Sequence, residues 1–429
     1  MAGLIAAYIA CTLAVTIGVL YPYVALLVYV AFAIVKPAEM WFWSLAGTHL
    51  SSITFSGLAV GWLLRGLADW RLGQAWAPML ALVFFWMWGW ISWCNSTDPS
   101  LAPFLPGLYI TGSHTDNDLS LDNLLHLGKI VVPCFIGITL LDSEKKVLGL
   151  LYTIILSQGY VAWEMNLAYL IEGYNRIRLD GFAGLDNNSI AVSLVTCCLP
   201  AFLSAYYCTS TFFRLALAAS GLLILHAILL TFSRGGMVAL IISFITAILV
   251  MRGGWKKYAF VCPLIVITVA LCGSEVWDRF LTIFLPTEEL DPAARSRLEL
   301  WTDCLDVMVR FPLFGVGPEN WTRIAAAYGW PPGKEAHSLW LQTGAELGLP
   351  GLAAILGYYL ISGFRLYSIR GDNRQMNSIR DAVLVGLGGF IVSAQFVSLE
   401  LLETPYYLTL CGLGIIKRVS QRRFTFGEI

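Results

Sequence analysis

The chain alternates between apolar runs, many of them about 20 residues long, and polar links. The first run, residues 3–35, carries no charge, and as one helix it would be about 50 Å long against a hydrocarbon core of about 30 Å. Tyr21-Pro22 is therefore expected to break it into two short spans. Further apolar runs occupy residues 50–64, 75–95, 127–141, 147–163, 189–206, 215–233, 237–251, 258–274, 348–364, 382–400 and 404–416. The pattern predicts an all-α polytopic membrane protein with about 12 transmembrane helices.

The polar links alternate in charge along the chain. Every second link is rich in Lys and Arg, and the positive-inside rule assigns these links to the cytoplasm. Their basic residues are Arg65, Arg71, Lys145, Lys146, Arg214, Arg252, Lys256, Lys257, Arg365, Arg370, Arg374, Arg380, Lys417, Arg418, Arg422 and Arg423. The remaining links should face outward, and of these only residues 275–336 form an insert long enough to fold over the bilayer. We therefore expect one membrane domain, residues 1–429, with a long outward loop at 275–336.

Composition supports this class and excludes others. The chain is 58% hydrophobic and 13% charged, with a mean hydropathy of +0.71, which is too apolar for a soluble globular protein. A net charge of -1 offers no attraction for nucleic acid, so a nucleic-acid partner is not expected. Most of the ten cysteines lie in apolar runs, and no Cys/His cluster predicts a metal site.

The first candidate motif is Ser233-Arg234-Gly235-Gly236, which lies between two apolar runs. An arginine at this position must reach water, a lipid headgroup or an anion, because an unpaired charge in hydrocarbon is costly. Gly235 and Gly236 permit a tight turn whose backbone N–H groups could bind phosphate oxygens. The alternative is an interfacial arginine that extends to the headgroups.

The second candidate is the segment that contains Arg295 and Arg297. Apolar residues recur there at helical spacing, at Leu298, Trp301, Leu305, Met308 and Val309. The segment is therefore expected to form an amphipathic helix that Pro312 ends, with Arg297 one turn before Trp301. Either arginine could bind an anion, and either could be a solvated surface charge.

The third candidate is His337. Ser338, Gln342 and Glu346 recur every four residues after it and form a polar stripe on a predicted helix. His337 would thus lie at the helix N-terminus, where the helix dipole disfavours imidazolium and keeps the ring neutral and able to accept a proton. The alternative is a helix cap or a satisfied polar group.

The fourth candidate is Asp186-Asn187-Asn188, at the outer mouth of the run from 189. Asp or Asn at this position caps a helix, and it could also orient an arginine or a sugar hydroxyl. Arg234, Arg297 and His337 are all assigned outward. Two guanidinium groups could stabilise a leaving diphosphate without a metal, while a neutral imidazole accepts the proton of an attacking hydroxyl.

These motifs, in order, resemble the O-antigen ligase and polymerase superfamily. The resemblance rests on Ser233-Arg234-Gly235-Gly236, Arg297-Leu-Glu-Leu-Trp301, Pro312-Leu-Phe-Gly315-Val-Gly317, Ala336-His337-Ser338 and Glu346-Leu-Gly-Leu-Pro-Gly351. Asp186-Asn187-Asn188 and residues 22–37 look most like the branch of O-glycosylation ligases associated with exosortase systems. The common family form has Asn where this chain has Ser338.

The resemblance implies a GT-C-like glycosyltransferase of the bacterial inner membrane. It would take a glycan from undecaprenyl diphosphate and join it to a hydroxyl of a lipid A core, a protein or a glycan on the periplasmic side, so that residues 275–336 would be a periplasmic loop. His337 matches the family's proposed base, and Arg234 and Arg297 match the arginines proposed to hold the diphosphate. No cofactor is implied. An O-antigen polymerase or a protein O-oligosaccharyltransferase could use the same site.

Two readings from other classes stay open. His114-Thr115-Asp116-Asn117-Asp118 contains a DxD pattern of the kind that binds a divalent cation in some membrane glycosyltransferases; loss of transfer with EDTA that Mg²⁺ restores would favour it. A flippase or exporter for lipid-linked glycan would move substrate across a bilayer and form no glycosidic bond. Transporters tend to show paired halves and charges at the midplane of spans, and neither is clear in this chain.

Overall fold

The computed structural model describes residues 2–45, 47–96, 114–282, 292–331, 333–369 and 373–426. Within these residues the regular elements are helices, apart from one isolated bridge between Phe182 and Leu185. The predicted all-α class is confirmed. The DxD pattern begins α7, and the side chains of residues 114–118 lie outside what the structure describes.

The N-terminal third forms a layer of short and long helices. The break predicted at Tyr21-Pro22 is confirmed, because Pro22 begins a new helix there. The elements are α1 (Ala2–Leu20), α2 (Pro22–Val35), α3 (Pro37–Met40), α4 (Phe42–Leu45), α5 (Leu50–Leu64), η1 (Gly73–Ala75), α6 (Trp76–Ser96) and α7 (His114–Leu140).

The helix α10 lies at the centre of the fold. Nearly all of its apolar window is buried, and it packs against α11 and α18. α10 spans Asn187–Tyr207. The helices in contact with it are α8 (Glu144–Glu172), α9 (Arg176–Leu179), α11 (Thr211–Leu230), α12 (Arg234–Val250), α18 (Arg374–Ser393) and α19 (Glu403–Phe426). The apolar run at 382–400 was predicted to be a single span, but α18 ends at Ser393 and an irregular segment follows it.

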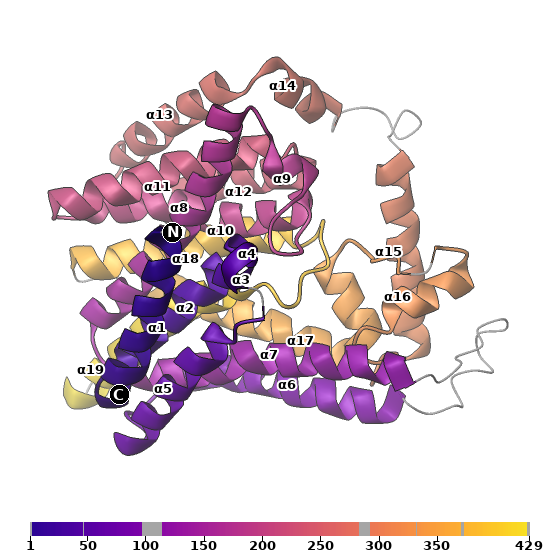
Figure 1. Cartoon of the computed structure of the whole chain (residues 1–429), viewed down its shortest axis with the longest axis horizontal. Helices are drawn as coiled ribbons and strands as arrows, with labels where there is room; N and C mark the ends of the chain where they lie inside the picture. Colours follow the sequence, from indigo (N-terminus) through magenta and orange to yellow (C-terminus); the bar gives the residue numbers. More distant parts are fainter. Residues whose placement is uncertain are drawn as a thin grey trace.

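The long predicted loop is largely helical. It contains α14 (Ser274–Leu281), α15 (Pro292–Arg310), α16 (Trp321–Ile324) and η5 (Ala325–Tyr328), between α13 (Lys256–Leu271) and α17 (Leu339–Ser368). The chain bends by 106° between α13 and α14. Figure 1 shows α15 and α16 at one end of the longer helices α6, α7 and α17.

The predicted amphipathic helix is confirmed as α15, which ends just before Pro312. Its packed face matches the predicted apolar positions at Met308, which is buried, and at the partly buried Trp301, but not at the other three. Leu298, Leu305 and Val309 are exposed, whereas Leu300, Cys304 and Val307 are buried in a cluster between α15 and α17. The periodicity identified the helix, and tertiary packing selected its buried face.

The chain is a multi-pass membrane protein. Among the described residues, six helices are long and apolar enough to cross a bilayer, or seven if the bent pair α13–α14 forms one span. Four shorter apolar helices accompany them. The count of about 12 spans stays a prediction, because α12 falls just short in length and α18 and α19 carry charged residues.

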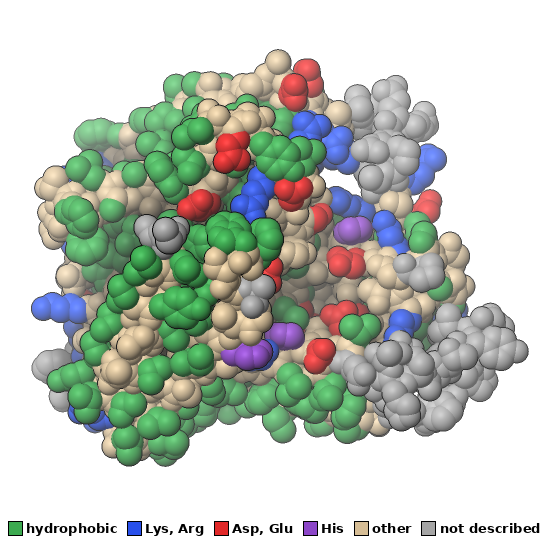
Figure 2. Space-filling model, viewed as in Figure 1, with side chains coloured by type: hydrophobic (Ala, Val, Ile, Leu, Met, Phe, Trp, Pro, Cys, Tyr) green, Lys and Arg blue, Asp and Glu red, His purple; other side chains and the backbone are tan. Residues whose placement is uncertain are grey.

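The polar links sort to two ends of the bundle, as their alternation predicted. The basic links contact one another at one end, where Arg422 bonds Glu144 (2.6 Å) and Arg374 bonds the Tyr206 carbonyl (2.8 Å). The links predicted to face outward meet at the opposite end. Figure 2 shows Asp, Glu, Lys, Arg and His side chains around a hollow on the side where α9, α14 and α15 lie.

Candidate active site

His337 lies just before α17 in a backbone conformation that is uncommon for histidine. Its φ is 51°, in the left-handed region, which costs roughly 1–2 kcal/mol for a residue other than glycine. Ser338 is the N-cap of α17, and its side chain accepts the backbone N–H of Leu341 (3.4 Å). Strained residues of this kind persist where their surroundings fix the chain, and they concentrate at functional sites.

Hydrogen bonds fix the backbone on both sides of His337. The Trp301 indole N–H donates to the carbonyl oxygen of Ala336 (3.1 Å). The backbone N–H of Ser338 donates to the Ser398 hydroxyl (3.3 Å). The histidine corner is therefore held between α15 on one side and the segment that follows α18 on the other.

The surroundings of His337 keep its imidazole neutral at pH 7. Burial lowers the pKa most, and the positive charges of Arg297 and Lys334 lower it further, to about 4, against the opposing charge of Asp186. We predicted a neutral ring from the helix dipole. The causes that lower the pKa are burial and the two neighbouring positive charges. Because the charges of Arg297 and Asp186 both act on this pKa, the two side chains lie near His337.

Arg297 and Arg295 both come from the first turns of α15. The Arg297 side chain is partly buried, whereas Arg295 is exposed. Arg297 lies one helical turn before Trp301, the residue that binds the Ala336 carbonyl. The helix therefore positions the arginine and a support of the histidine corner together.

Arg234 is the first residue of α12, directly after the N-cap Ser233. The Ser233 side chain accepts the N–H of Gly236 (3.2 Å). Gly235 and Gly236 belong to the first helical turn, so the tight turn that we predicted there is wrong, and the Gly236 N–H is already bonded. The Arg234 guanidinium donates to the Thr282 hydroxyl at the end of α14 (3.4 Å).

The two glycines permit close packing. A Cβ at Gly235 would lie 2.9 Å from the Cβ of Phe396, and one at Gly236 would lie 3.0 Å from the Cβ of Ala191. Both separations are shorter than ordinary contacts between carbon atoms. The glycines therefore bring the start of α12 against α10 and the segment after α18, which positions Arg234.

Phe396 lies between the elements that carry Arg234, Arg297 and His337. Its side chain lies against Gly235, beside Arg234. Its ring centroid is 6.5 Å from that of Trp301, which in turn is bonded beside His337. Arg234, Arg297 and His337 therefore come from elements that meet around the segment after α18. That the three line a single cavity stays a prediction.

The Asp186 loop serves as a cap and as a connection. Asp186 caps α10 by accepting the backbone N–H of Ser189 (2.8 Å). Burial opposes its ionisation, but the hydrogen bonds from Ser189 and Asn188, together with nearby His337, leave its pKa below the usual value. Asn187 donates to the carbonyl of Thr231 (2.8 Å). The loop thus joins α10 to the turn before Arg234.

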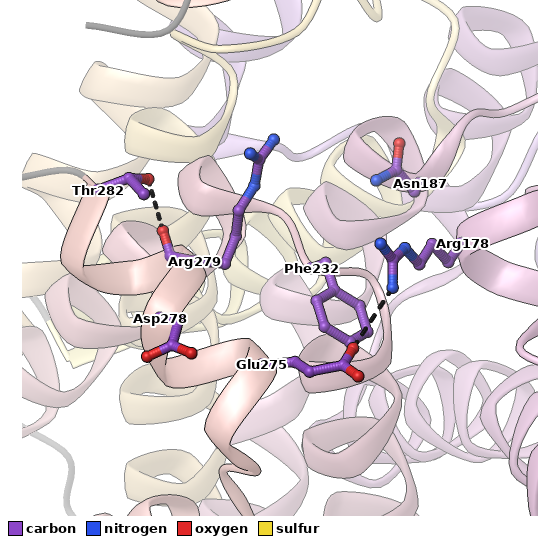
Figure 3. Close-up of a pocket in the computed structure, with 7 residues that line it drawn as sticks. All are labelled: Arg178, Asn187, Phe232, Glu275, Asp278, Arg279 and Thr282. Atoms are coloured by element: carbon purple, nitrogen blue, oxygen red, sulfur yellow. Dashed lines mark hydrogen bonds and ion pairs between the residues drawn. The ribbon is translucent and has the colours of Figure 1, made fainter. Parts of the chain in front are cut away.

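A cavity of about 420 Å³ lies beside this turn. Figure 3 shows Arg178, Arg279 and Asn187 around it, with Arg178 paired with Glu275 (3.6 Å). Thr282, the hydrogen-bond partner of Arg234, also lines it. The carboxylates of Glu275 and Asp278 line the same cavity, so an anion bound by Arg178 and Arg279 would compete with Glu275 for the Arg178 guanidinium.

The motifs at 312–317 and 346–351 contact each other. The backbone N–H of Leu349 donates to the Pro312 carbonyl (2.8 Å), and that of Gly317 donates to the Glu346 carbonyl (2.8 Å). α17 is broken at Gly348, where φ is 69°. A Cβ at Gly348 would lie 2.3 Å from the Leu313 carbonyl oxygen, so the break requires glycine. These contacts fix the first part of α17, which begins beside His337.

Several site residues were missed in the sequence. Arg178 and Arg279 lie in outward links, where each resembles an ordinary solvated charge, and their only signal was that shared side. Phe396 and Ser398 fell within an apolar run that we interpreted as a span. No local pattern marks any of the four.

Comparison with known proteins gives one match. Residues 219–356 match the family described as O-antigen ligase. The matched segment contains Arg234, Arg297 and His337, whereas Asp186 precedes it. No curated protein sequence matches the chain. The match indicates a membrane enzyme of O-antigen ligase or polymerase type, and the exosortase association stays a prediction.

Proposed function

We propose, from the premise that the chain belongs to the O-antigen ligase and polymerase superfamily, that it transfers a glycan from undecaprenyl diphosphate to an acceptor hydroxyl. The observation that carries the proposal is the neutral, backbone-fixed His337 with Arg297 nearby, beside an arginine-lined cavity. The reaction would take place on the periplasmic side of a bacterial inner membrane. The gathering of the basic links at the opposite end of the bundle supports that orientation.

The proposed step is a displacement at the anomeric carbon of the donor. The acceptor hydroxyl gives its proton to His337, and its oxygen forms the new bond to the anomeric carbon. The bond from that carbon to the diphosphate oxygen breaks, and its electron pair stays on the diphosphate. Arg234 and Arg297 stabilise the developing charge, with Arg178 and Arg279 as additional anion ligands. The step needs no metal and inverts the anomeric configuration.

Donor binding would also strengthen the base. A ring with a pKa of about 4 is available at pH 7 but is a weak proton acceptor. A bound diphosphate places negative charge near Arg297, offsets the charge that lowers the His337 pKa, and so raises that pKa toward neutrality. The base becomes effective when the donor is in place.

The test is transfer by purified His337→Ala protein with a lipid-diphosphate glycan donor. We expect transfer to be abolished while the protein inserts and unfolds like the wild type. His126→Ala is the matched control, because His126 is an exposed histidine of α7, and it should transfer normally. Near-normal transfer by His337→Ala would remove the base assignment.

The acceptor class needs a separate measurement. Mass spectrometry of the glycans, lipids and proteins made with and without this protein separates a lipid A core ligase, a protein glycosylase and a polymerase. Transport of lipid-linked glycan without a new glycosidic bond would contradict all three.

A further inference from the structure

A second cavity, of about 220 Å³, borders the Asp186 loop and the start of α17. Leu185 and Leu339 line it, whereas Asn187 lines the first cavity, which contains Arg178 and Arg279 and is called the arginine cavity below. Asp186 therefore lies between residues that line the two cavities, and His337 is two residues from Leu339. Both cavities thus border the loop that contains Asp186, and the second also borders the start of α17 after His337.

The second cavity differs in its charged groups from the first, which is lined by Arg178 and Arg279 together with Glu275 and Asp278. Glu319, Glu346 and Glu400 line it, and none of its lining residues is Lys or Arg. Glu346 is nearly fully buried and accepts from the Gln342 amide (3.2 Å) and from the backbone N–H of Trp321 (3.3 Å). Carboxyl groups with no Lys or Arg among the lining residues do not attract a phosphate into this cavity. They favour ligands that donate hydrogen bonds.

Asn123 indicates the kind of ligand independently. Its side chain lines the cavity and is only 5% exposed. The amide Nδ2 donates to Glu319 (2.7 Å), but Oδ1 is buried without a hydrogen-bond partner in the part of the chain that the structure describes. A buried acceptor of this kind is matched by a hydroxyl or amine donor.

We propose that this cavity binds the sugar end of the acceptor, as a neutral or amine-bearing sugar, and directs its nucleophilic hydroxyl toward His337. The inference rests on the proposed function. An inverting displacement needs the nucleophile on the side of the anomeric carbon opposite the leaving group. With the diphosphate in the cavity at Arg178 and Arg279, the acceptor would occupy the separate carboxyl-lined cavity, which Leu339 lines two residues after His337.

The ionisation of Glu400 suits this role. Glu400 lies in the segment before α19, and burial together with the charge of Glu319 raises its pKa to about 8. At pH 7 its carboxyl group is therefore mostly protonated and can donate to a sugar oxygen, whereas an ionised carboxylate accepts from a hydroxyl or an ammonium group. The cavity thus offers both donors and acceptors to a polyhydroxylated ligand.

The described His, Cys, Asp and Glu residues form no group of three that could hold a metal ion. The arrangement of these carboxyl groups therefore does not suit a cation site. A sugar would form separate hydrogen bonds with these donors and acceptors and does not require them to converge on one point.

The experiment measures ligand binding rather than transfer. Saturation-transfer NMR on the full-length protein in detergent compares three probes: methyl glucoside, the methyl glycoside of glucosamine, and methyl glucuronide. We expect the first two to bind and the glucuronide to bind at least about tenfold more weakly. Glu319→Gln should weaken binding of the amino glycoside severalfold and reduce the discrimination against glucuronide, whereas Glu400→Gln, which replaces a mostly protonated carboxyl group by a neutral amide, should change the discrimination little.

Arg279→Gln is the control, because Arg279 lines the other cavity. It should leave sugar binding unchanged and weaken binding of inorganic diphosphate severalfold, with the reverse pattern for Glu319→Gln. Thermal unfolding of each variant verifies folding, and Glu346 is left intact because it bonds the backbone at Trp321. Absence of sugar binding to the wild type, or equal losses in the Glu319 and Arg279 variants, would overturn the proposal.

The outcomes separate this inference from the proposed function. If His337→Ala transfers normally while the binding pattern holds, the base assignment fails and the cavity assignment stands. If His337→Ala is inactive while Glu319→Gln binds sugars like the wild type, the cavity assignment fails alone.

Discussion

The indole N–H of Trp301 donates to the carbonyl oxygen of Ala336 at 3.1 Å, directly before His337. Trp301 lies one turn after Arg297 on α15 and against Phe396. A single side chain therefore connects the arginine helix, the segment after α18 and the strained histidine. A displacement of α15 would therefore move Arg297 and would also reach the backbone beside His337 through this hydrogen bond.

Trp301→Phe should lower kcat/KM for transfer by more, expressed as a free energy, than it lowers the free energy of unfolding. The substitution keeps an aromatic ring beside Phe396 but removes the donor to Ala336, and the loss of one hydrogen bond, about 0.5–1.5 kcal/mol, corresponds to a decrease of up to about tenfold. The measurement is kcat/KM for transfer together with thermal unfolding. Trp340→Phe is the control, because its indole donates at the same distance of 3.1 Å to the Ile391 carbonyl rather than to the backbone beside His337. Equal effects of the two variants on transfer would argue against a positioning role.

The pH profile of transfer should have its acid limb well below neutrality. The pKa of His337 is lowered to about 4 by burial and by Arg297 and Lys334, so the ring is neutral above that pH and loses its base function below it. We expect kcat/KM, which reports the free enzyme, to fall near pH 4. The limb of kcat should lie at higher pH, because the bound diphosphate raises the His337 pKa.

Lys334→Gln tests the cause of this pH profile. Removal of one nearby positive charge should raise the His337 pKa and shift the acid limb of kcat/KM to higher pH, with the rate at pH 7 little changed. Lys145→Gln, at the basic end of the bundle, should leave the limb in place. A limb that moves to lower pH in Lys334→Gln would contradict the assignment of the titration to His337.

Gly348→Ala should destabilise the protein by about 2–5 kcal/mol. The φ of 69° at this position costs a residue with a side chain roughly 1–2 kcal/mol, and the added Cβ would lie 2.3 Å from the Leu313 carbonyl oxygen, an overlap of the kind that costs typically 1–3 kcal/mol. Gly363→Ala on the same helix meets nothing within 4 Å and should be neutral or slightly stabilising. Thermal unfolding in detergent measures both, and a Gly348→Ala protein as stable as the wild type would contradict the required break.

Much of the helical framework could be predicted because local chemistry sets it. Proline ends helices, so the break at Tyr21-Pro22 and the end of α15 before Pro312 followed directly from the sequence. The start of α17 after His337 followed from the spacing of its polar stripe. Residues 394–400 were misread, because Val397 and Leu399 are apolar although their segment turns back to contact the histidine corner.

The arginine cavity could not be predicted from any local pattern. Arg178 belongs to the short helix α9, and Arg279 comes from α14, 101 residues later. They line one cavity because the chain bends by 106° between α13 and α14. A bend of this size depends on what the helices pack against, so only the shared side of the membrane could be predicted for the two arginines.

Arg234→Gln should lower transfer by about 10²–10³, the loss typical when one stabilising donor of a developing anion is removed. Arg234→Lys should restore only part of the activity, because an ammonium group keeps the charge but lacks the planar pair of donors that binds a diphosphate at two points. Both variants should insert and unfold like the wild type, since Arg234 lies at the start of α12 and its side chain is only partly buried. Arg214→Gln is the control, an exposed arginine at the basic end of the bundle, and its transfer should be unchanged. Full activity in Arg234→Lys would mean that charge alone suffices and that two-point binding of the leaving group is wrong.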